Sequence, residues 1–199
     1  MIELDEIQRA CKPERTVRLE HLGDAMAIFG RRERREERRG AVHYRMREKL
    51  VAIGDDYWIE DDAGQRVFKV NGKALRVRDT LIFEDASGTE LLKIQQRMLH
   101  IRDTMEIENA HGDKVATVKK ALITPLRDRF EVLVENGPDM EVHGNIVDHE
   151  YRIERGGKKV AEVSRKWFRV ADTYGVEADP SQDAVLLLAV TAALDQMTR

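Results

Sequence analysis

The chain has 199 residues, 36% of them charged, and a formal net charge of −3. The length fits one large domain, or one domain with an extension. Charge of mixed sign supplies no global basic field, so we expect no nucleic-acid partner. Cys11 is the single cysteine, which excludes an internal disulfide and suits a reducing compartment. Because the N-terminal residues also lack an apolar signal core, we expect a cytoplasmic protein.

Residues 1–40 are predicted to form a charged extension, partly helical or disordered, before a domain that spans residues 41–199. Apolar residues between Val17 and Phe29 fit a short amphipathic helix. The run from Arg31 to Gly40 contains six arginines and three glutamates and is therefore locally basic. Such a run suits a solvated helix with charge pairs or a disordered linker, and an arm that touches anionic lipid or nucleic acid is the alternative.

An internal repeat begins after the first alternating stretch, which starts near Val42. Three segments read strand, acidic turn with glycine, strand, and their glycines, Gly64, Gly88 and Gly112, lie 24 residues apart. Glycine supplies the positive φ that a tight hairpin turn requires. A shorter fourth copy is expected from Ile153 to Gly157. The acidic residues of these units are therefore interpreted as turn residues and not as metal ligands.

A second motif, an Asp-Thr pair, alternates with the hairpin turns. It occurs as Asp79-Thr80, Asp103-Thr104 and Asp172-Thr173. Both side chains can bond to nearby backbone donors, which suits a tight corner. Turns and corners thus follow one another about every dozen residues, the rhythm of an antiparallel barrel. We predict a mainly β protein with roughly 12 antiparallel strands in a closed barrel.

The last segment, Asp179 to Met197, is predicted to be a helix. Asp179 is a favourable N-cap, Pro180 fits the first helical position, and Gln182 fits a capping box. From Ala184 the residues are mostly alanine and leucine, which are strong helix formers.

This helix carries no charge from Ala184 to Leu194, and its apolar residues run around all sides. Such a helix is enclosed by protein or by lipid. A membrane-spanning helix needs about 20 apolar residues, and this run is much shorter, so we expect it to fill the barrel, which at twelve strands has room for one helix. The residues expected in the core are Trp167, Phe168, Tyr174, Val185, Leu186, Leu187, Leu188, Val190 and Leu194.

Three stretches and the helix carry a family resemblance. They are REKLVAIGDDYWIEDDAG from Arg47, KALRVRDTLIFEDASG from Lys73, and RKWFRVADTYGVEADP from Arg165. Together they resemble the LURP-one-related family, the bacterial and plant branch of the tubby C-terminal-like superfamily, which is related to phospholipid scramblases. The resemblance covers about Val42 to Met197 and implies a barrel closed around a hydrophobic C-terminal helix.

The resemblance implies two kinds of function. Plant relatives suggest a soluble structural or interaction module with a protein partner, and we expect a monomer. Tubby proteins bind phosphoinositides, which suggests peripheral binding of anionic phospholipid at a membrane, or a scramblase-like protein. The cationic residues that would bind lipid phosphate are Lys73, Arg76, Arg78, Arg97, Lys119, Lys120, Arg165 and Lys166.

We expect neither enzymatic activity nor a cofactor. The six histidines show no metal-ligand spacing, and the chain lacks GxSxG, Walker and GxGxxG motifs. We expect no metal site. By likeness to scramblases, the segment before the last helix supplies the only calcium candidates, and it lacks the spacing of an EF-hand loop; they are Asp172, Glu177, Asp179 and Asp183.

Overall fold

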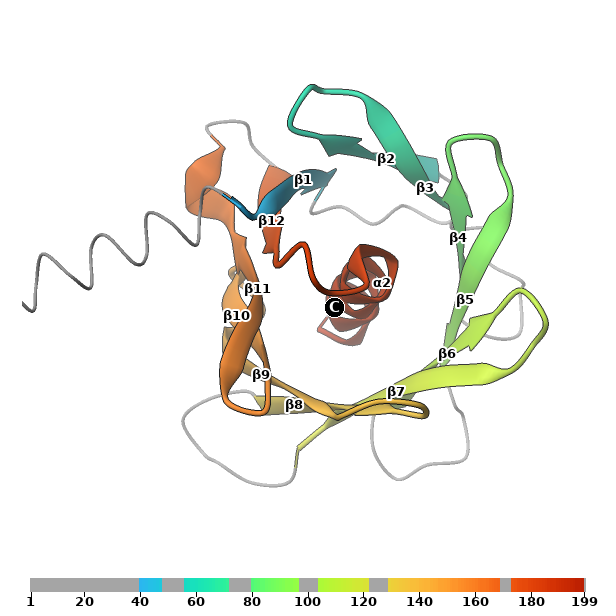
Figure 1. Ribbon diagram of the computed structural model, residues 1–199, viewed down its shortest axis with the longest axis vertical. Coiled ribbons are helices and arrows are strands. Elements are labelled where there is room, and N and C mark those ends of the chain that lie inside the picture. Colours follow the sequence, from blue (N-terminus) through green and yellow to red (C-terminus); the bar gives the residue numbers. More distant parts are fainter. Residues whose placement is uncertain are drawn as a thin grey trace, which may run out of the picture. The chain divides into compact units, whose positions relative to one another are not determined.

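A computed structural model describes residues 40–47, 56–71, 80–96, 104–121, 129–168 and 173–198. Within these residues, twelve strands form a closed antiparallel barrel in which each strand pairs with its neighbours in sequence and β1 pairs with β12 (Figure 1). The strands are β1 (Val42–Arg47), β2 (Asp56–Asp61), β3 (Arg66–Asn71), β4 (Thr80–Asp85), β5 (Glu90–Gln96), β6 (Thr104–Asn109), β7 (Lys114–Lys120), β8 (Arg129–Val134), β9 (Met140–Asn145), β10 (Glu150–Arg155), β11 (Lys158–Ser164) and β12 (Thr173–Ala178). The predicted barrel is confirmed.

The repeated hairpin turns share one hydrogen-bonding pattern. Gly64, Gly88 and Gly112 have φ of 73°, 86° and 85°, the left-handed region that favours glycine. The side chain of Asp85 accepts hydrogen bonds from the backbone N–H groups of Ser87 and Thr89 at 2.8 and 2.9 Å. Equivalent bonds are made by Asp61 and Asn109 in their own turns. Turn geometry therefore accounts for Asp61 and Asp85 of the repeat.

The barrel encloses α2 (Ala184–Met197), whose coiled ribbon lies inside the ring of strands in Figure 1. The predicted start of this helix was wrong. Its N-cap is Asp183, which accepts from the backbone N–H of Leu186 at 3.1 Å. Asp179 instead accepts from the N–H and hydroxyl of Ser181 in a preceding turn, and the side chain of Gln182 accepts from Arg155 at 2.6 Å.

Most of the predicted core residues are buried between α2 and the strands. Tyr174 and five helix residues are at most 5% exposed, and Val185 is partly buried against them; the five are Leu186, Leu187, Leu188, Val190 and Leu194. Trp167 and Phe168 correct the prediction, because both are only partly buried and neither belongs to the core cluster. Trp167 is the last residue of η1 (Arg165–Trp167), a short 3-10 helix between β11 and β12, and Phe168 is the C-cap of that helix.

Candidate functional site

Cross-strand ion pairs cover the outer face of the barrel at the period of the repeat. Arg45 pairs with Glu60 at 3.1 Å, Lys69 with Glu84 at 3.5 Å, and Lys93 with Glu108 at 3.3 Å. In each pair the two residues stand directly opposite one another on neighbouring strands, and successive pairs lie 24 residues apart. These three cations therefore stand beside carboxylates that neutralise much of their field.

Two of the cations predicted to bind lipid phosphate also stand in ion pairs, one across neighbouring strands and one between η1 and β10. Lys119 lies 2.9 Å from Glu131, and Lys166 lies 3.1 Å from Glu150. Lys120 and Arg165 also make polar or electrostatic interactions. The remaining candidates, Lys73, Arg76, Arg78 and Arg97, lie outside the described residues.

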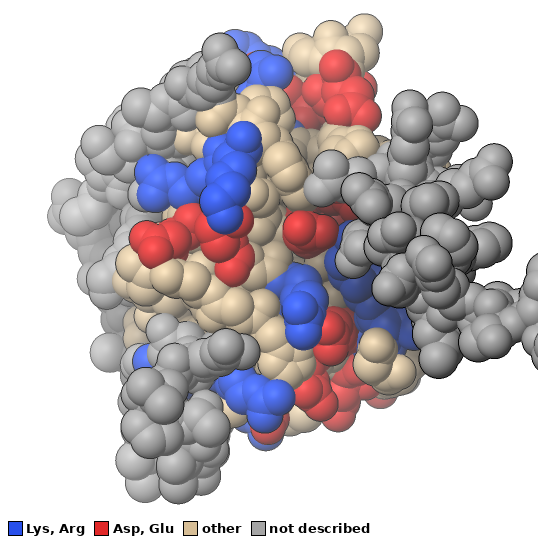
Figure 2. Space-filling model, turned by 90° about the vertical axis from the view of Figure 1, so that its left-hand side faces the viewer, with Lys and Arg blue, Asp and Glu red and all other residues tan. Residues whose placement is uncertain are grey.

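The structure does not bring the described candidates together. Lys119 and Lys120 lie on β7, whereas Arg165 and Lys166 lie on η1, directly after β11. Three strands of the barrel, β8, β9 and β10, stand between β7 and β11. Figure 2 shows the face on the left of Figure 1, where basic and acidic side chains alternate in small groups. The described residues of that face therefore present mixed charge and not a continuous basic surface.

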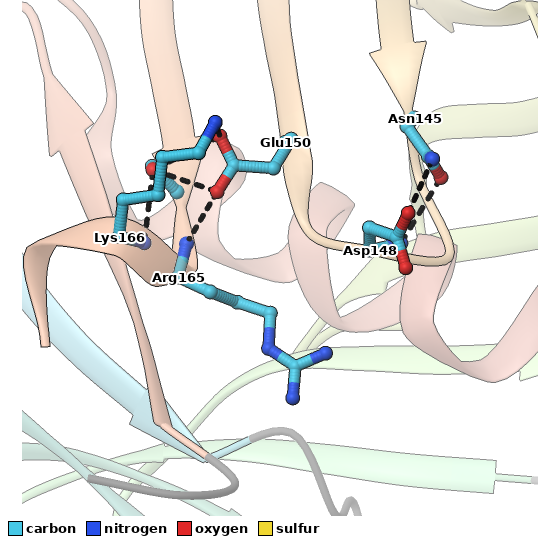
Figure 3. Close-up of polar contacts among 6 residues, drawn as sticks. Asn145, Asp148, Glu150, Arg165 and Lys166 are labelled. Atoms are coloured by element: carbon cyan, nitrogen blue, oxygen red, sulfur yellow. Dashed lines mark hydrogen bonds and ion pairs between the residues drawn. The ribbon is translucent and has the colours of Figure 1, made fainter. Parts of the chain in front are cut away.

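Glu150 organises the turn that follows β11 (Figure 3). Its carboxylate accepts from the Ser164 hydroxyl at 3.0 Å, the Arg165 backbone N–H at 3.2 Å and the Lys166 ammonium at 3.1 Å. Partial burial acts to raise the pKa of Glu150, but the hydrogen bonds from Lys166 and Ser164 outweigh it and hold the pKa below its usual value. The guanidinium of Arg165 points away from Glu150 in Figure 3.

This turn places two aromatic rings on the outside of the barrel. Tyr174 and Val176 point into the core, so Gly175 between them faces outward. The rings of Trp167 and Phe168 lie over Gly175, where they occupy the space of a side chain. We call the group formed by these rings with His43 and Arg45 the outer aromatic patch: His43 meets the Trp167 ring edge-on at 6.3 Å, and Arg45 lies 4.9 Å over the Phe168 ring.

The described calcium candidates have other bonding roles. Glu177 lies 3.3 Å from Lys159 and 3.5 Å from His43. Asp179 accepts from Ser181, and Asp183 caps α2. Asp172 lies outside the described residues. Among the residues that the structure describes, no three His, Cys, Asp or Glu side chains gather as a metal ion would require.

A polar cluster that the sequence did not reveal lies inside the barrel, at the C-terminal turn of α2. The carboxylate of Asp195 is 2.9 Å from His149 Nε2 and accepts from the Tyr174 hydroxyl at 2.5 Å. Asp195 is 4% exposed and His149 6% exposed. The His149 ring stacks on the Tyr174 ring at 4.2 Å. We call His149, Tyr174 and Asp195 the buried cluster.

Two further tyrosines border the buried cluster. Burial raises the pKa of Tyr174 well above its usual value, with further contributions from Asp195, Tyr57 and Tyr151. Burial and Asp195 likewise raise the pKa of Tyr151. The hydroxyls of Tyr151 and Tyr174 therefore remain protonated at neutral pH and can donate hydrogen bonds.

The turn between β9 and β10 delivers His149 to this cluster. His149 has φ of 53°, and the turn is closed by Asn145, which donates to Asp148 at 2.6 Å and accepts from its backbone N–H at 3.1 Å (Figure 3). Gly144 permits the close backbone approach, since a Cβ there would lie 2.5 Å from the carbonyl oxygen of Glu150. The only signal in the sequence was a charged residue at the end of an apolar helix, which requires a partner if buried.

The geometry defines a closed antiparallel barrel around an apolar C-terminal helix, the tubby C-terminal-like class of fold. The family model of the LURP-one-related proteins matches residues 42–195, and the chain belongs to that family. Its fold is similar to the X-ray structure of a protein from Arabidopsis thaliana, with a TM-score of 0.60 and 18% sequence identity. That likeness covers 80% of this chain and 92% of the plant protein. No curated protein sequence matches the chain. In the described residues, no helix has both the length and the apolar character needed to cross a membrane.

Proposed function

We propose that the chain is a non-enzymatic, cytoplasmic interaction module that binds a protein partner through the outside of its barrel. The pairing of outer-face cations with carboxylates supports this proposal most directly. A protein that is held at an anionic membrane by charge needs several cations whose field reaches the lipid, each contributing about 1 kcal/mol. Pairs such as Lys119–Glu131 and Lys166–Glu150 offset much of that attraction.

The outer aromatic patch is the surface of the described barrel best suited to a protein partner. Binding energy at protein interfaces is concentrated in Trp, Tyr and Arg side chains. Trp167 and Arg45 stand together here, and Arg45 retains a side-chain exposure of 47% while it pairs with Glu60. The hydrogen bonds of Glu150 fix the turn that carries Trp167, which reduces the ordering cost of binding.

The test is capture from an extract of the native host, with proteins and lipids identified together by mass spectrometry. Wild-type protein should enrich a defined protein, and Trp167→Ala should lose it while retaining a cooperative thermal transition. The matched control is Leu133→Ala, which removes an apolar side chain from another exposed position of the barrel. Enrichment of the same lipids by all three proteins, with no protein that depends on Trp167, would refute the proposal.

The alternative is peripheral binding of anionic phospholipid, or a scramblase-like role. One observation favours it: Arg165 and Lys166 are adjacent cations on η1, and the Lys166 side chain is 79% exposed. Release of Lys166 from Glu150 would make its ammonium available to a phosphate group, next to the guanidinium of Arg165. A scramblase-like insertion of α2 is less compatible with the fold, because removal of this helix would expose the core of the barrel.

A further inference from the structure

We propose that the buried cluster of His149, Tyr174 and Asp195 is a polar latch that fixes the position of the C-terminal turn of α2 inside the barrel. The latch is a conformational device of the fold and does not depend on the partner proposed above. Its members come from three separate elements: the β9–β10 turn, β12 and α2.

The apolar contacts of α2 do not by themselves fix its rotation and depth inside the barrel. The helix is buried on all sides from Leu186 to Asp195, and apolar attraction is proportional to area and has no direction. Hydrogen bonds require particular distances and angles. The Thr191 hydroxyl donates to the Leu187 carbonyl of the same helix, so this bond does not tie α2 to a strand. The bonds of Asp195 to His149 and Tyr174 supply direction at one end.

Breaking the hydrogen bonds of the latch would cost free energy, so the latch favours one position of α2 inside the barrel. A carboxylate at the C-terminal end of a helix is unfavourable with respect to the helix dipole. It also loses its hydration when buried, so it requires donors from the surrounding protein. A turn or slide of α2 would separate Asp195 from both donors at once. Asp195 therefore penalises every arrangement except the one observed.

The backbone conformation of His149 indicates that contacts within the buried cluster hold this residue in place. His149 adopts a left-handed conformation, which is uncommon for residues other than glycine and asparagine. Unfavourable backbone conformations persist where surrounding contacts determine them. The stacking of the His149 ring on Tyr174 keeps the two donors in contact with each other as well as with Asp195.

Amide hydrogen exchange of the full chain tests the latch. Tyr174→Phe removes one donor and keeps the ring, and Asp195→Asn removes the charge and keeps the shape. In both variants, amides of residues 191–197 should exchange about 10- to 100-fold faster, the factor expected for a lost hydrogen bond to a charged group. Amides of 186–188 and of the central strands should keep their wild-type rates. Tyr44→Phe, which removes a hydroxyl from a partly buried tyrosine outside the cluster, should change neither group.

Two results would overturn the latch. One is equal acceleration of exchange in α2 and in all strands, because that reports a loss of global stability without a local role. The other is unchanged exchange at residues 191–197 in Tyr174→Phe. If Asp195→Asn does not fold, Tyr174→Phe decides alone, since it is the smallest change that removes a hydrogen bond of the cluster.

Discussion

Gly175 lies directly beneath the indole ring of Trp167: a Cβ at position 175 would be 2.5 Å from Trp167 Cε3 and 2.8 Å from Phe168 Cε2. The side chains of Tyr174 and Val176, on either side of Gly175, face the core, so position 175 faces the outside of the barrel. The two aromatic rings that pack on Gly175 therefore lie on the outside. This contact also explains why sequence alone placed them wrongly. Trp167 and Phe168 are large and apolar, but they cover a glycine on the outer face.

Gly175→Ala should displace both rings and destabilise the barrel by about 1–3 kcal/mol, as expected when an extra methyl group enters a packed contact. Urea unfolding measures the loss, and tryptophan fluorescence in a Trp58→Phe background should shift to the red. Gly137→Ala is the control, because its nearest Cβ neighbour would lie at an ordinary 3.5 Å. Equal stability of Gly175→Ala and wild type would show that the rings do not pack on position 175.

Leu187→Asp should abolish folding, because Leu187 is 2% exposed between α2 and the strands. An unpaired charge buried there costs more than about 4 kcal/mol, a large share of the stability of a domain. Solubility and thermal unfolding by circular dichroism measure the effect. Leu133→Asp, at 37% exposure on β8, should remain folded. A soluble Leu187→Asp protein that melts cooperatively would contradict the enclosure of α2.

Gly64→Ala, Gly88→Ala and Gly112→Ala should each cost about 1–2 kcal/mol, the penalty for a left-handed conformation in a residue with a Cβ. The three losses should be equal within error, because the turns share the same φ region and each has an Asp or Asn side chain that accepts the same backbone hydrogen bond. Urea midpoints measure them, with Gly40→Ala as the control outside the turns. Strongly unequal losses would mean that the three turns, although similar in sequence, do not contribute equally to the free energy of unfolding.

The sequence predicted the barrel because its information is local and periodic. The glycines at 64, 88 and 112 indicate tight turns that require a positive φ. The apolar run from Ala184, which covers all sides of the helix, indicates a helix enclosed by protein. The start of α2 was harder, since Asp179 and Asp183 are both good caps and only the turn through Ser181 decides between them.

The buried cluster could not be predicted for a different reason. His149 and Asp195 are 46 residues apart, and their contact depends on how the β9–β10 turn closes over the end of α2. Neither residue carries a local signal of that geometry. The ion pairs of the outer face were hidden in the same way, because the partner of Lys69 or Lys93 depends on strand register.

Alkaline pH should unfold the barrel. The pKa values of Tyr151 and Tyr174 are raised in the folded state, first by burial and then by Asp195, whereas an unfolded tyrosine ionises near pH 10. The folded state therefore holds more protons above pH about 10, and stability that is fully present below that pH is lost as the pH rises.

Absorbance of tyrosinate and circular dichroism, recorded together against pH, test this expectation. Tyr151 and Tyr174 should ionise only as the strand signal disappears, and Tyr174→Phe should remove one of the late groups. Ionisation of all four tyrosines near pH 10 with an intact strand signal would contradict the burial of the cluster.

Flotation of the full chain with vesicles of anionic phospholipid, at low and at high salt, tests most directly the claim that the charged outer face serves a protein partner and not a membrane. Paired cations such as Lys119 and Lys166 predict that the protein stays with the soluble fraction at both salt concentrations. Flotation at low salt that high salt reverses would contradict the account, and loss of that flotation in Arg165→Glu/Lys166→Glu would place the membrane contact on η1.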